Sequence, residues 1–186
     1  MSLKLTPGCQ RHLQLPHDSS QGAGSGRGSA PENRLQGYIE PCRTFIPLLA
    51  LTPFFMRLES EQLMWVMDNS QEWMAGSETP IVSNHDAGRS IWILVDGSWR
   101  VEYERQHFTA TRSDAGCWFG SEEMPAFKGR VRLVTTSPSY ILNMTNESLR
   151  EMLELGFDIR KNLDRGIQYY HRLMLVAEGE AGDEPE

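Results

Sequence analysis

The chain has 186 residues, of which 25 are acidic and 18 are basic, so its formal net charge is −7 at neutral pH. This length accommodates one domain with a hydrophobic core, and a hydrophobic content of 39% is typical of globular proteins. The negative charge disfavours binding to nucleic acid or anionic lipid. Since no apolar run is long enough to cross a bilayer and no secretory signal is recognisable, we expect a cytoplasmic protein without a membrane partner.

The two ends of the chain differ in composition from its middle. Residues 1–37 contain several prolines and a Gly/Ser-rich run, which cannot bury enough apolar surface to offset the entropy lost on ordering. Residues 178–186 are mostly acidic and repel one another. The composition therefore predicts a flexible leader at 1–37, one globular domain at 38–177 and a disordered acidic tail at 178–186.

The first predicted element of the domain is a short helix over residues 61–67. Leu63, Val66 and Met67 lie on one side of it at helical spacing. From residue 71 to residue 145 the chain consists of short runs of β-branched and aromatic residues separated by turn-forming residues. This pattern predicts a series of strands.

One pair of strands is especially clear in the pattern. The Asp96-Gly97 dipeptide is typical of a tight turn, so we predict a β-hairpin that joins strands at 90–96 and 98–105. In the second strand apolar residues alternate with charged ones, which predicts one buried face and one exposed face.

Two helices are predicted after the strands. Thr145 or Asn146 can cap the first, which ends near Gly156. The second covers residues 157–176 and is amphipathic. Its apolar residues recur every three or four positions: Ile159, Leu163, Ile167, Tyr170 and Met174. This long apolar stripe predicts a homodimer formed through the C-terminal helix.

The order of these elements predicts an α+β fold. We expect an antiparallel β-roll, similar to a double-sheet jelly roll, with a short N-terminal helix on one side and two C-terminal helices on the other.

Glycines and aromatic residues recur along the predicted strands in a definite order. They are Gly76, Ile81-Val82, the turn 84–88, the strand 91–94, Gly97 and the run Gly116-Cys117-Trp118-Phe119-Gly120. This order resembles the cyclic-nucleotide-binding domain family, which includes the catabolite activator protein and the regulatory subunits of protein kinase A. The resemblance extends over residues 54–176 and implies a ligand-binding β-roll.

The run that ends at Gly120 resembles the entry to the family's phosphate-binding cassette. In the family a glutamate follows the Phe-Gly pair, and an arginine follows that glutamate by nine positions. Here Ser121 stands in place of the glutamate, and Arg130 lies nine positions further on. The resemblance implies that a cassette helix and Arg130 would bind the phosphate. The lost carboxylate would cost about 1.5–3 kcal/mol of ligand binding.

Other residues of the cassette also disfavour an anion. Glu122 and Glu123 would open the cassette helix and oppose a phosphate, and Val131 and Arg132 are expected to crowd the pocket. Binding could survive if Glu122 replaced the missing acceptor or if Ser121 bonded the ribose directly. The candidate ligand-binding residues are Phe119, Gly120, Ser121, Glu122, Arg130 and Val131.

Two of these interpretations have structural alternatives. Arg130 could be a surface arginine paired with Glu122 or Glu123. Tyr169 and Tyr170, on the last helix, could cap a bound base as a lid, or they could be ordinary packing residues or part of a dimer seam.

No catalytic or metal-binding pattern is recognisable. The three cysteines are far apart and are expected to be reduced, with Cys117 as a small buried hydrophobe or, alternatively, a redox sensor. The histidines lack the close spacing of a cupin metal site, and no nucleophile motif occurs. We therefore predict no metal, no catalytic residue and no enzymatic activity, with a metal-dependent cupin enzyme as a remote alternative.

These observations predict a stand-alone regulatory or sensor domain for signalling. We expect that its degenerate cassette does not bind cyclic nucleotide tightly and that it has no cofactor beyond weakly bound cyclic AMP or cyclic GMP. We also expect it to act through an unidentified protein partner. Whether it binds another small-molecule ligand is left open. One alternative is a genuine cyclic AMP or cyclic GMP receptor in which Arg130 holds the phosphate. Another is a protein-interaction scaffold without a ligand.

Overall fold

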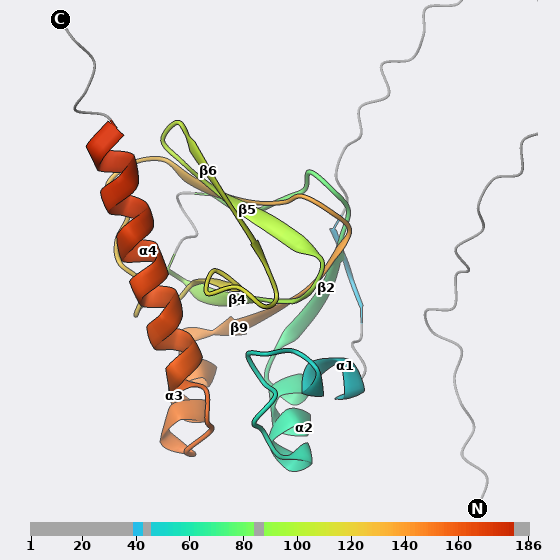
Figure 1. Cartoon of the computed structure of the whole chain (residues 1–186). Coiled ribbons are helices and arrows are strands. Elements are labelled where there is room, and N and C mark those ends of the chain that lie inside the picture. The colour runs from blue at the N-terminus through green and yellow to red at the C-terminus, as the bar shows by residue number, and fades with distance from the viewer. Residues whose placement is uncertain (1–38, 43–45, 84–87, 181–186) are drawn as a thin grey trace, which may run out of the picture. The chain divides into compact units, whose positions relative to one another are not determined.

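The computed structural model describes residues 39–42, 46–83 and 88–180. All of them belong to one compact unit, Leu35–Glu186. The predicted leader 1–37 and residues 181–186 of the predicted tail lie outside the described residues. The described residues form nine strands and four helices, and the predicted α+β roll is confirmed (Figure 1).

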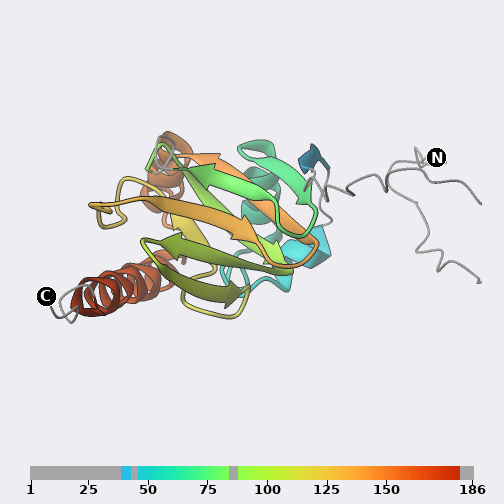
Figure 2. The same cartoon turned by 90° about the horizontal axis from the view of Figure 1, so that it is seen from above.

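The strands form two antiparallel sheets, which are seen from above in Figure 2. The first sheet has five strands in the order β1-β2-β9-β4-β7, and the second has four in the order β3-β8-β5-β6. The strands are β1 Ile39–Pro41, β2 Gln71–Ala75, β3 Pro80–Ser83, β4 Ser90–Asp96, β5 Ser98–Tyr103, β6 Gln106–Thr111, β7 Trp118–Gly120, β8 Val131–Thr135 and β9 Ser139–Thr145. The chain crosses between the sheets several times, so each sheet combines segments that are distant in the sequence.

The predicted hairpin at Asp96-Gly97 is wrong. Strands β4 and β5 lie in different sheets, because β4 pairs with β7 and β9 while β5 pairs with β6 and β8. The Asp96-Gly97 turn is a corner between the sheets, where a Cβ on Gly97 would overlap the Ser139 hydroxyl. The tight hairpin joins β5 to β6 instead, with Tyr103 opposite Gln106.

The alternation predicted for β5 is confirmed. Trp99, Val101 and Tyr103 are buried between the two sheets, while Arg100 and Glu102 lie on the outer face. In β4 both faces are covered, since Ile91 and Ile93 pack toward the helices and Leu94 packs inside the roll. This two-sided burial explains why β4 is apolar almost throughout.

Three helices and the start of a fourth cover one side of the five-stranded sheet, while the rest of the fourth packs against the core between the two sheets. The helices are α1 Ile46–Ala50, α2 Ser60–Asp68, α3 Asn146–Glu154 and α4 Arg160–Glu180. Helix α2 confirms the predicted N-terminal helix, although the short α1 before it was not predicted. At the start of α3 the Thr145 hydroxyl accepts a hydrogen bond from the Ser148 N–H at 3.1 Å, as its predicted capping role requires.

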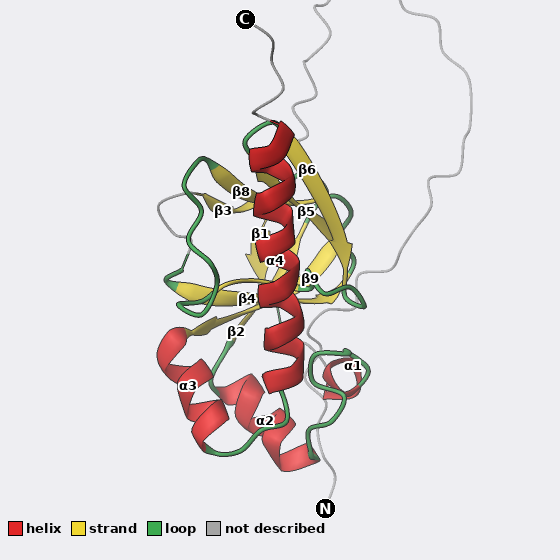
Figure 3. Ribbon diagram, turned by 60° about the vertical axis from the view of Figure 1, so that its left-hand side comes forward, coloured by secondary structure: helices red, strands yellow, loops and turns green. Residues whose placement is uncertain are grey.

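Helix α4 is longer than the sequence predicts. It continues to Glu180, so the boundary predicted at 178 falls within a helix. Ala177 explains the extension, because it is only 7% exposed and keeps the last turn packed on the roll. In Figure 3 α4 lies lengthwise along the domain, with α2 and α3 near its first turns. None of the helices in the described residues is both long and apolar enough to cross a membrane.

Candidate functional site

The segment that corresponds to the predicted cassette is the loop between β7 and β8, residues 121–130, here called the cassette loop. It borders a pocket of about 270 Å³. The pocket is lined by Gly88, Ser121, Glu122, Met124, Pro125, Ala126, Phe127, Gly129 and Val131. Three of the predicted site residues, Ser121, Glu122 and Val131, therefore meet at one pocket. Phe119, Gly120 and Arg130 are not among its lining residues.

The cassette loop contains no helix, which contradicts the expectation that Glu122 and Glu123 begin one. Pro125 contributes to this difference, because it lacks a backbone donor and disfavours the α conformation at Met124. Without a helix, no row of free N–H groups points toward a phosphate.

The chain enters the loop through two residues in the left-handed region, Gly120 at the end of β7 with φ +89° and Ser121 with φ +77°. A Cβ on Gly120 would overlap the carbonyl of Ser90, so this position requires glycine. The N–H of Ser121 donates to the same carbonyl at 3.0 Å. The buried hydroxyl of Ser121 accepts from the Glu123 N–H at 3.0 Å, so this side chain already stabilises the turn.

The two carboxylates of the loop have partners other than Arg130. Glu122 pairs with Arg150 at 2.9 Å, and Glu123 pairs with Arg160, at the start of α4, at 2.9 Å. The structural alternative in which either glutamate pairs with Arg130 is therefore wrong. Arg130 is exposed, and its side chain makes no ion pair with any other described residue.

Phe127 fills the interior of the roll beside the pocket. Its ring centroid lies 4.9 Å from that of Tyr103, 6.0 Å from that of Phe119 and 6.3 Å from that of Tyr170. Met124, from the same loop, packs against both buried clusters of the domain. Sequence reasoning missed both residues. The only indication was that they are the large apolar side chains in an otherwise polar, Gly/Pro-containing loop.

Val131 and Arg132 lie on opposite sides of β8. Val131 is buried and lines the pocket, as expected for a residue that crowds it. The same expectation is wrong for Arg132, which lies on the outer face and pairs with Glu102 at 3.1 Å. The alternation of side chains along a strand accounts for the difference.

The two candidate lid residues have different environments. Tyr170 is fully buried, its hydroxyl donates to the carbonyl of Trp118, and burial raises its pKa well above the usual range. Tyr169 is half-buried and its ring lies against Gly116. The position of Tyr170 agrees with the packing alternative, and the capping role of either tyrosine stays a prediction.

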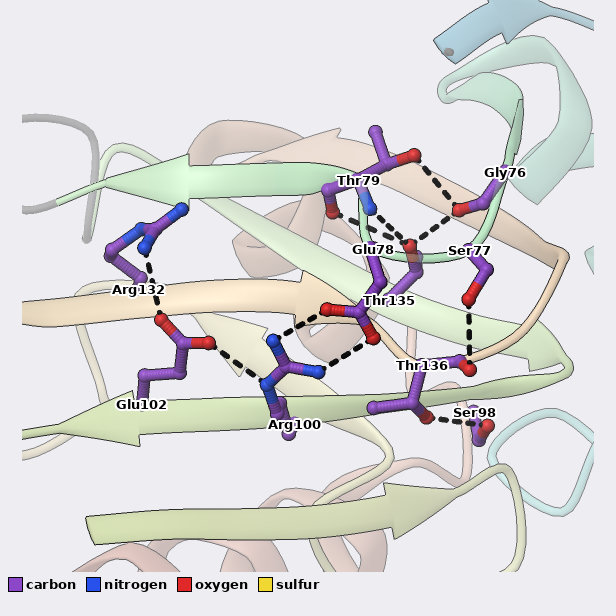
Figure 4. Close-up of polar contacts among 10 residues, drawn as sticks. All are labelled: Gly76, Ser77, Glu78, Thr79, Ser98, Arg100, Glu102, Arg132, Thr135 and Thr136. Carbon is purple, nitrogen blue, oxygen red and sulfur yellow. Dashed lines mark hydrogen bonds and ion pairs between the residues drawn. The ribbon is translucent and has the colours of Figure 1, made fainter. Parts of the chain in front are cut away.

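The most extensive polar network lies on the outer face of the four-stranded sheet (Figure 4). The Arg100 guanidinium donates to both carboxylate oxygens of Glu78, at 2.8 and 2.7 Å, and to Glu102 at 2.8 Å. These hydrogen bonds hold the pKa of Glu78 below its usual value. Because the single positive charge of Arg100 is already matched by Glu78 and Glu102, this side chain is suited to joining parts of the sheet and not to binding a charged ligand.

A nearby corner is held by hydroxyl groups, as Figure 4 also shows. The buried Thr135 hydroxyl donates to the Gly76 carbonyl and accepts from the Thr79 N–H at 2.9 Å. This arrangement satisfies backbone groups where β3 begins and fixes the path of the chain there.

The described residues bear on two alternatives, a metal site and a redox-sensing thiol. No group of three or more His, Cys, Asp or Glu side chains among them could hold a metal ion. Cys117 is 6% exposed, and burial raises the pKa of its thiol to about 12, so thiolate chemistry is suppressed. This environment favours Cys117 as a small buried hydrophobe over a redox sensor.

A second pocket, of about 450 Å³, was not predicted. Its lining residues are Cys42, Met67, Asp68, Ser70, Gln71, Glu72 and Trp73. It lies where β2 follows α2, away from the cassette loop in the sequence. The Trp73 indole N–H is buried there without a hydrogen-bond acceptor among the described residues.

Comparison with known proteins shows that the fold is that of cyclic-nucleotide-binding domains. The chain is similar to PKAR CBD2 bound to Sp-2Cl-cAMPS, with a TM-score of 0.53, 14% identity, and coverage of 76% of this chain and 91% of that one. It is similar to a CooA double mutant from Carboxydothermus hydrogenoformans, with a TM-score of 0.53, 15% identity, and coverage of 73% and 90%.

A third solved structure extends the comparison. It is the regulatory subunit of a cAMP-independent protein kinase A from Trypanosoma brucei, with a TM-score of 0.51, 15% identity, and coverage of 70% of this chain and 50% of that one. No protein-family model and no curated protein matches the chain. The resemblance predicted from the sequence is thus confirmed at the level of the fold.

Proposed function

We propose that the chain is a regulatory domain that does not bind cyclic nucleotides tightly and that acts through a protein partner. The observation that carries this proposal is the pocket of the cassette loop. Among its lining residues the only charged side chain is the carboxylate of Glu122. A nucleotide phosphate would find no cation among these lining residues, and the carboxylate of Glu122 is already paired with Arg150.

The small volume of the pocket also supports weak or absent binding of cyclic nucleotides. Small-molecule sites usually measure about 300–1,000 Å³, and this pocket has about 270 Å³. Phe127 stacks between aromatic residues of the roll, so the adjoining interior is filled by the chain itself. A ligand would have to displace this ring as well as bind without a matched cation.

One of the similar solved structures supports this proposal. One of the similar proteins is a regulatory subunit of a kinase named as cAMP-independent. By analogy, the present domain would deliver its output to a partner without cyclic AMP. No catalytic activity is assigned to it, and its action in the cytoplasm and its homodimerisation stay predictions from the sequence.

The experiment is calorimetric titration of the full chain with cyclic AMP and with cyclic GMP. We expect no saturable heat at micromolar concentration for the wild type. Saturable binding at that level that disappears in Arg130→Ala would overturn the proposal. Arg132→Ala is the matched control, because it removes the same charge from a side chain on the outer face of the roll.

A genuine receptor is the second candidate function, and Arg130 is the observation that favours it. Its exposed side chain has no ion pair within the described residues, and its neighbours Gly129 and Val131 both line the pocket. Movement of the loop could bring its guanidinium to a phosphate. Phe127→Ala tests this candidate, because removal of the ring should then improve cyclic-nucleotide binding measurably.

A further inference from the structure

The solvent-exposed face of α4 carries a row of cations. Lys161, Arg165 and Arg172 follow one another at helical spacing on one side of the helix, with Gln168 between them, and all are exposed. We call Lys161, Arg165 and Arg172 the basic stripe. At about 1.5 Å per residue it extends for roughly 17 Å along the helix.

The stripe is not neutralised by the rest of the domain. No ion pair joins Lys161, Arg165 or Arg172 to another side chain of the described residues. By contrast, charged residues on the flanks of the same helix are paired, Arg160 with Glu123 and Glu178 with Lys128. Three unpaired cations thus lie together on a chain whose net charge is −7.

An apolar patch follows the stripe on the same face. Leu175 is 69% exposed and Val176 is 49% exposed, although both lie in a helix whose opposite side is fully packed. Figure 3 shows this helix along its whole length at the front of the domain. Exposed large apolar side chains next to a row of unpaired charges are typical of an interaction surface.

We propose that the basic stripe, together with Leu175 and Val176, is the docking surface for an acidic amphipathic helix of a partner protein. This inference rests on the proposed function, since it specifies the partner through which the domain acts. Carboxylates on the partner helix would pair with the three cations, and apolar residues one turn further on would cover Leu175 and Val176. Charge complementarity would determine orientation and specificity, and the apolar contact would add affinity.

A second copy of the chain fits this surface poorly. In a parallel pair of α4 helices each cation of the stripe would face its own copy. In an antiparallel pair whose two-fold axis passes between Gln168 and Tyr169, Arg165 would face Arg172 of the other copy. Like charges at such distances oppose association. The homodimer predicted from the sequence uses the opposite, apolar face of this helix, where Leu163 and Tyr170 are fully buried within the domain, and it stays a prediction.

Nucleic acid and anionic membranes fit it less well than a protein helix does. Asp164 and Glu178 flank the stripe, so a broad anionic surface would meet carboxylates beside the three cations, whereas a single helix can contact the stripe alone. Nucleic acid would also leave Leu175 and Val176 uncovered. An acidic helix can match the charges and cover the apolar patch together.

The experiment uses the full chain and a fluorescein-labelled designed helical peptide. The peptide carries Glu at positions i, i+4 and i+11 and Leu at i+14 and i+15, which are the spacings of the stripe and the apolar patch. A second peptide with the reversed sequence tests binding in the opposite orientation. We expect a saturable rise in anisotropy at low salt that weakens about tenfold or more in high salt. The triple variant Lys161→Glu, Arg165→Glu and Arg172→Glu should weaken binding by a similar factor.

Two controls separate the stripe from general charge. The variant Arg57→Glu, Arg105→Glu and Arg132→Glu makes the same change in net charge at exposed positions outside α4 and should bind as the wild type does. A peptide with Lys in place of Glu should not bind. Leu175→Ser with Val176→Ser should weaken binding while leaving the circular dichroism spectrum unchanged.

Several results would overturn the inference. They are absence of peptide binding, equal losses in the two charge-reversal variants, stripe-dependent binding to phosphatidylserine vesicles or duplex DNA instead of the peptide, and stripe-dependent dimerisation in sedimentation. None of them bears on cyclic nucleotides, so failure of the docking surface is distinguishable from failure of the proposed function.

Discussion

Gly120 and Ser90 show how single residues determine the path of the cassette loop. The chain leaves β7 with a left-handed backbone at Gly120, directly against the Ser90 carbonyl that accepts the Ser121 N–H. Two demands coincide at this residue, a positive φ and room for a neighbouring backbone. Either one alone would favour glycine, and together they should make it indispensable.

We predict that Gly120→Ala destabilises the domain more than Gly156→Ala does. Both glycines have a positive φ, but a Cβ on Gly156 would meet nothing within 4 Å. The control should therefore cost only about 1–2 kcal/mol of left-handed strain. Gly120→Ala should cost that strain plus a backbone displacement of about 1–3 kcal/mol. Urea unfolding of the two variants checks this, and equal losses would contradict it.

Among the individual residues of the candidate site, the sequence predicted some and missed others. The order of Gly116, Phe119 and Gly120 located the loop, because these residues follow one another closely in the sequence in an order that resembles a known family's pattern. Phe127 was missed, because its position depends on Tyr103 and Tyr170, which come from other elements. The partners of Glu122 and Glu123 were mispredicted for the same reason.

Among the elements, the corner between β4 and β5 shows the limit of local patterns. An Asp-Gly pair between two apolar runs is typical of a hairpin, yet the same dipeptide can turn the chain from one sheet into the other. The choice depends on β9 and β8, which supply the partners of β4 and β5 much later in the sequence. The alternation of buried and exposed residues in β5 and the apolar faces of the helices were predictable, because each depends only on which side of that one element faces solvent.

The packing of α4 on the roll leads to a prediction about the stability of the domain. Gly166 faces Trp118, and a Cβ there would overlap the indole, whose N–H donates to the Asn162 carbonyl at 3.2 Å. By helix propensity alone, alanine at position 166 would stabilise the domain by about 1 kcal/mol. We expect the overlap to dominate, so that Gly166→Ala lowers the free energy of unfolding by about 1–3 kcal/mol.

Gly179→Ala is the control for this prediction. Gly179 lies in the same helix, and a Cβ there would meet nothing within 4 Å. Its substitution should be neutral or stabilising by up to about 1 kcal/mol. Thermal unfolding followed by circular dichroism compares the two variants. If Gly166→Ala were as stable as the wild type, α4 would not be packed closely against Trp118.

Across the described part of the domain, three contacts join the cassette loop to α4. Glu123 pairs with Arg160 in the first turn of the helix, Phe127 contacts Tyr170 near its middle, and Lys128 pairs with Glu178 near its end at 3.3 Å. The exposed ion pairs contribute little stability individually. The buried contact of Tyr170 should therefore dominate the coupling between the loop and the helix.

Tyr170→Phe tests this coupling across the molecule. The substitution removes the hydroxyl that donates to the buried Trp118 carbonyl and should cost about 1–3 kcal/mol. Hydrogen exchange should accelerate in residues 121–130 and in α4 together, because this hydrogen bond fixes the position of the ring that Phe127 of the loop contacts. Tyr169→Phe is the matched control, since the half-buried Tyr169 hydroxyl makes no hydrogen bond with the described residues, and it should change exchange little. Faster exchange in α4 alone would mean that the loop is held independently of the helix, and that a ligand or partner acting on one could not influence the other through Tyr170.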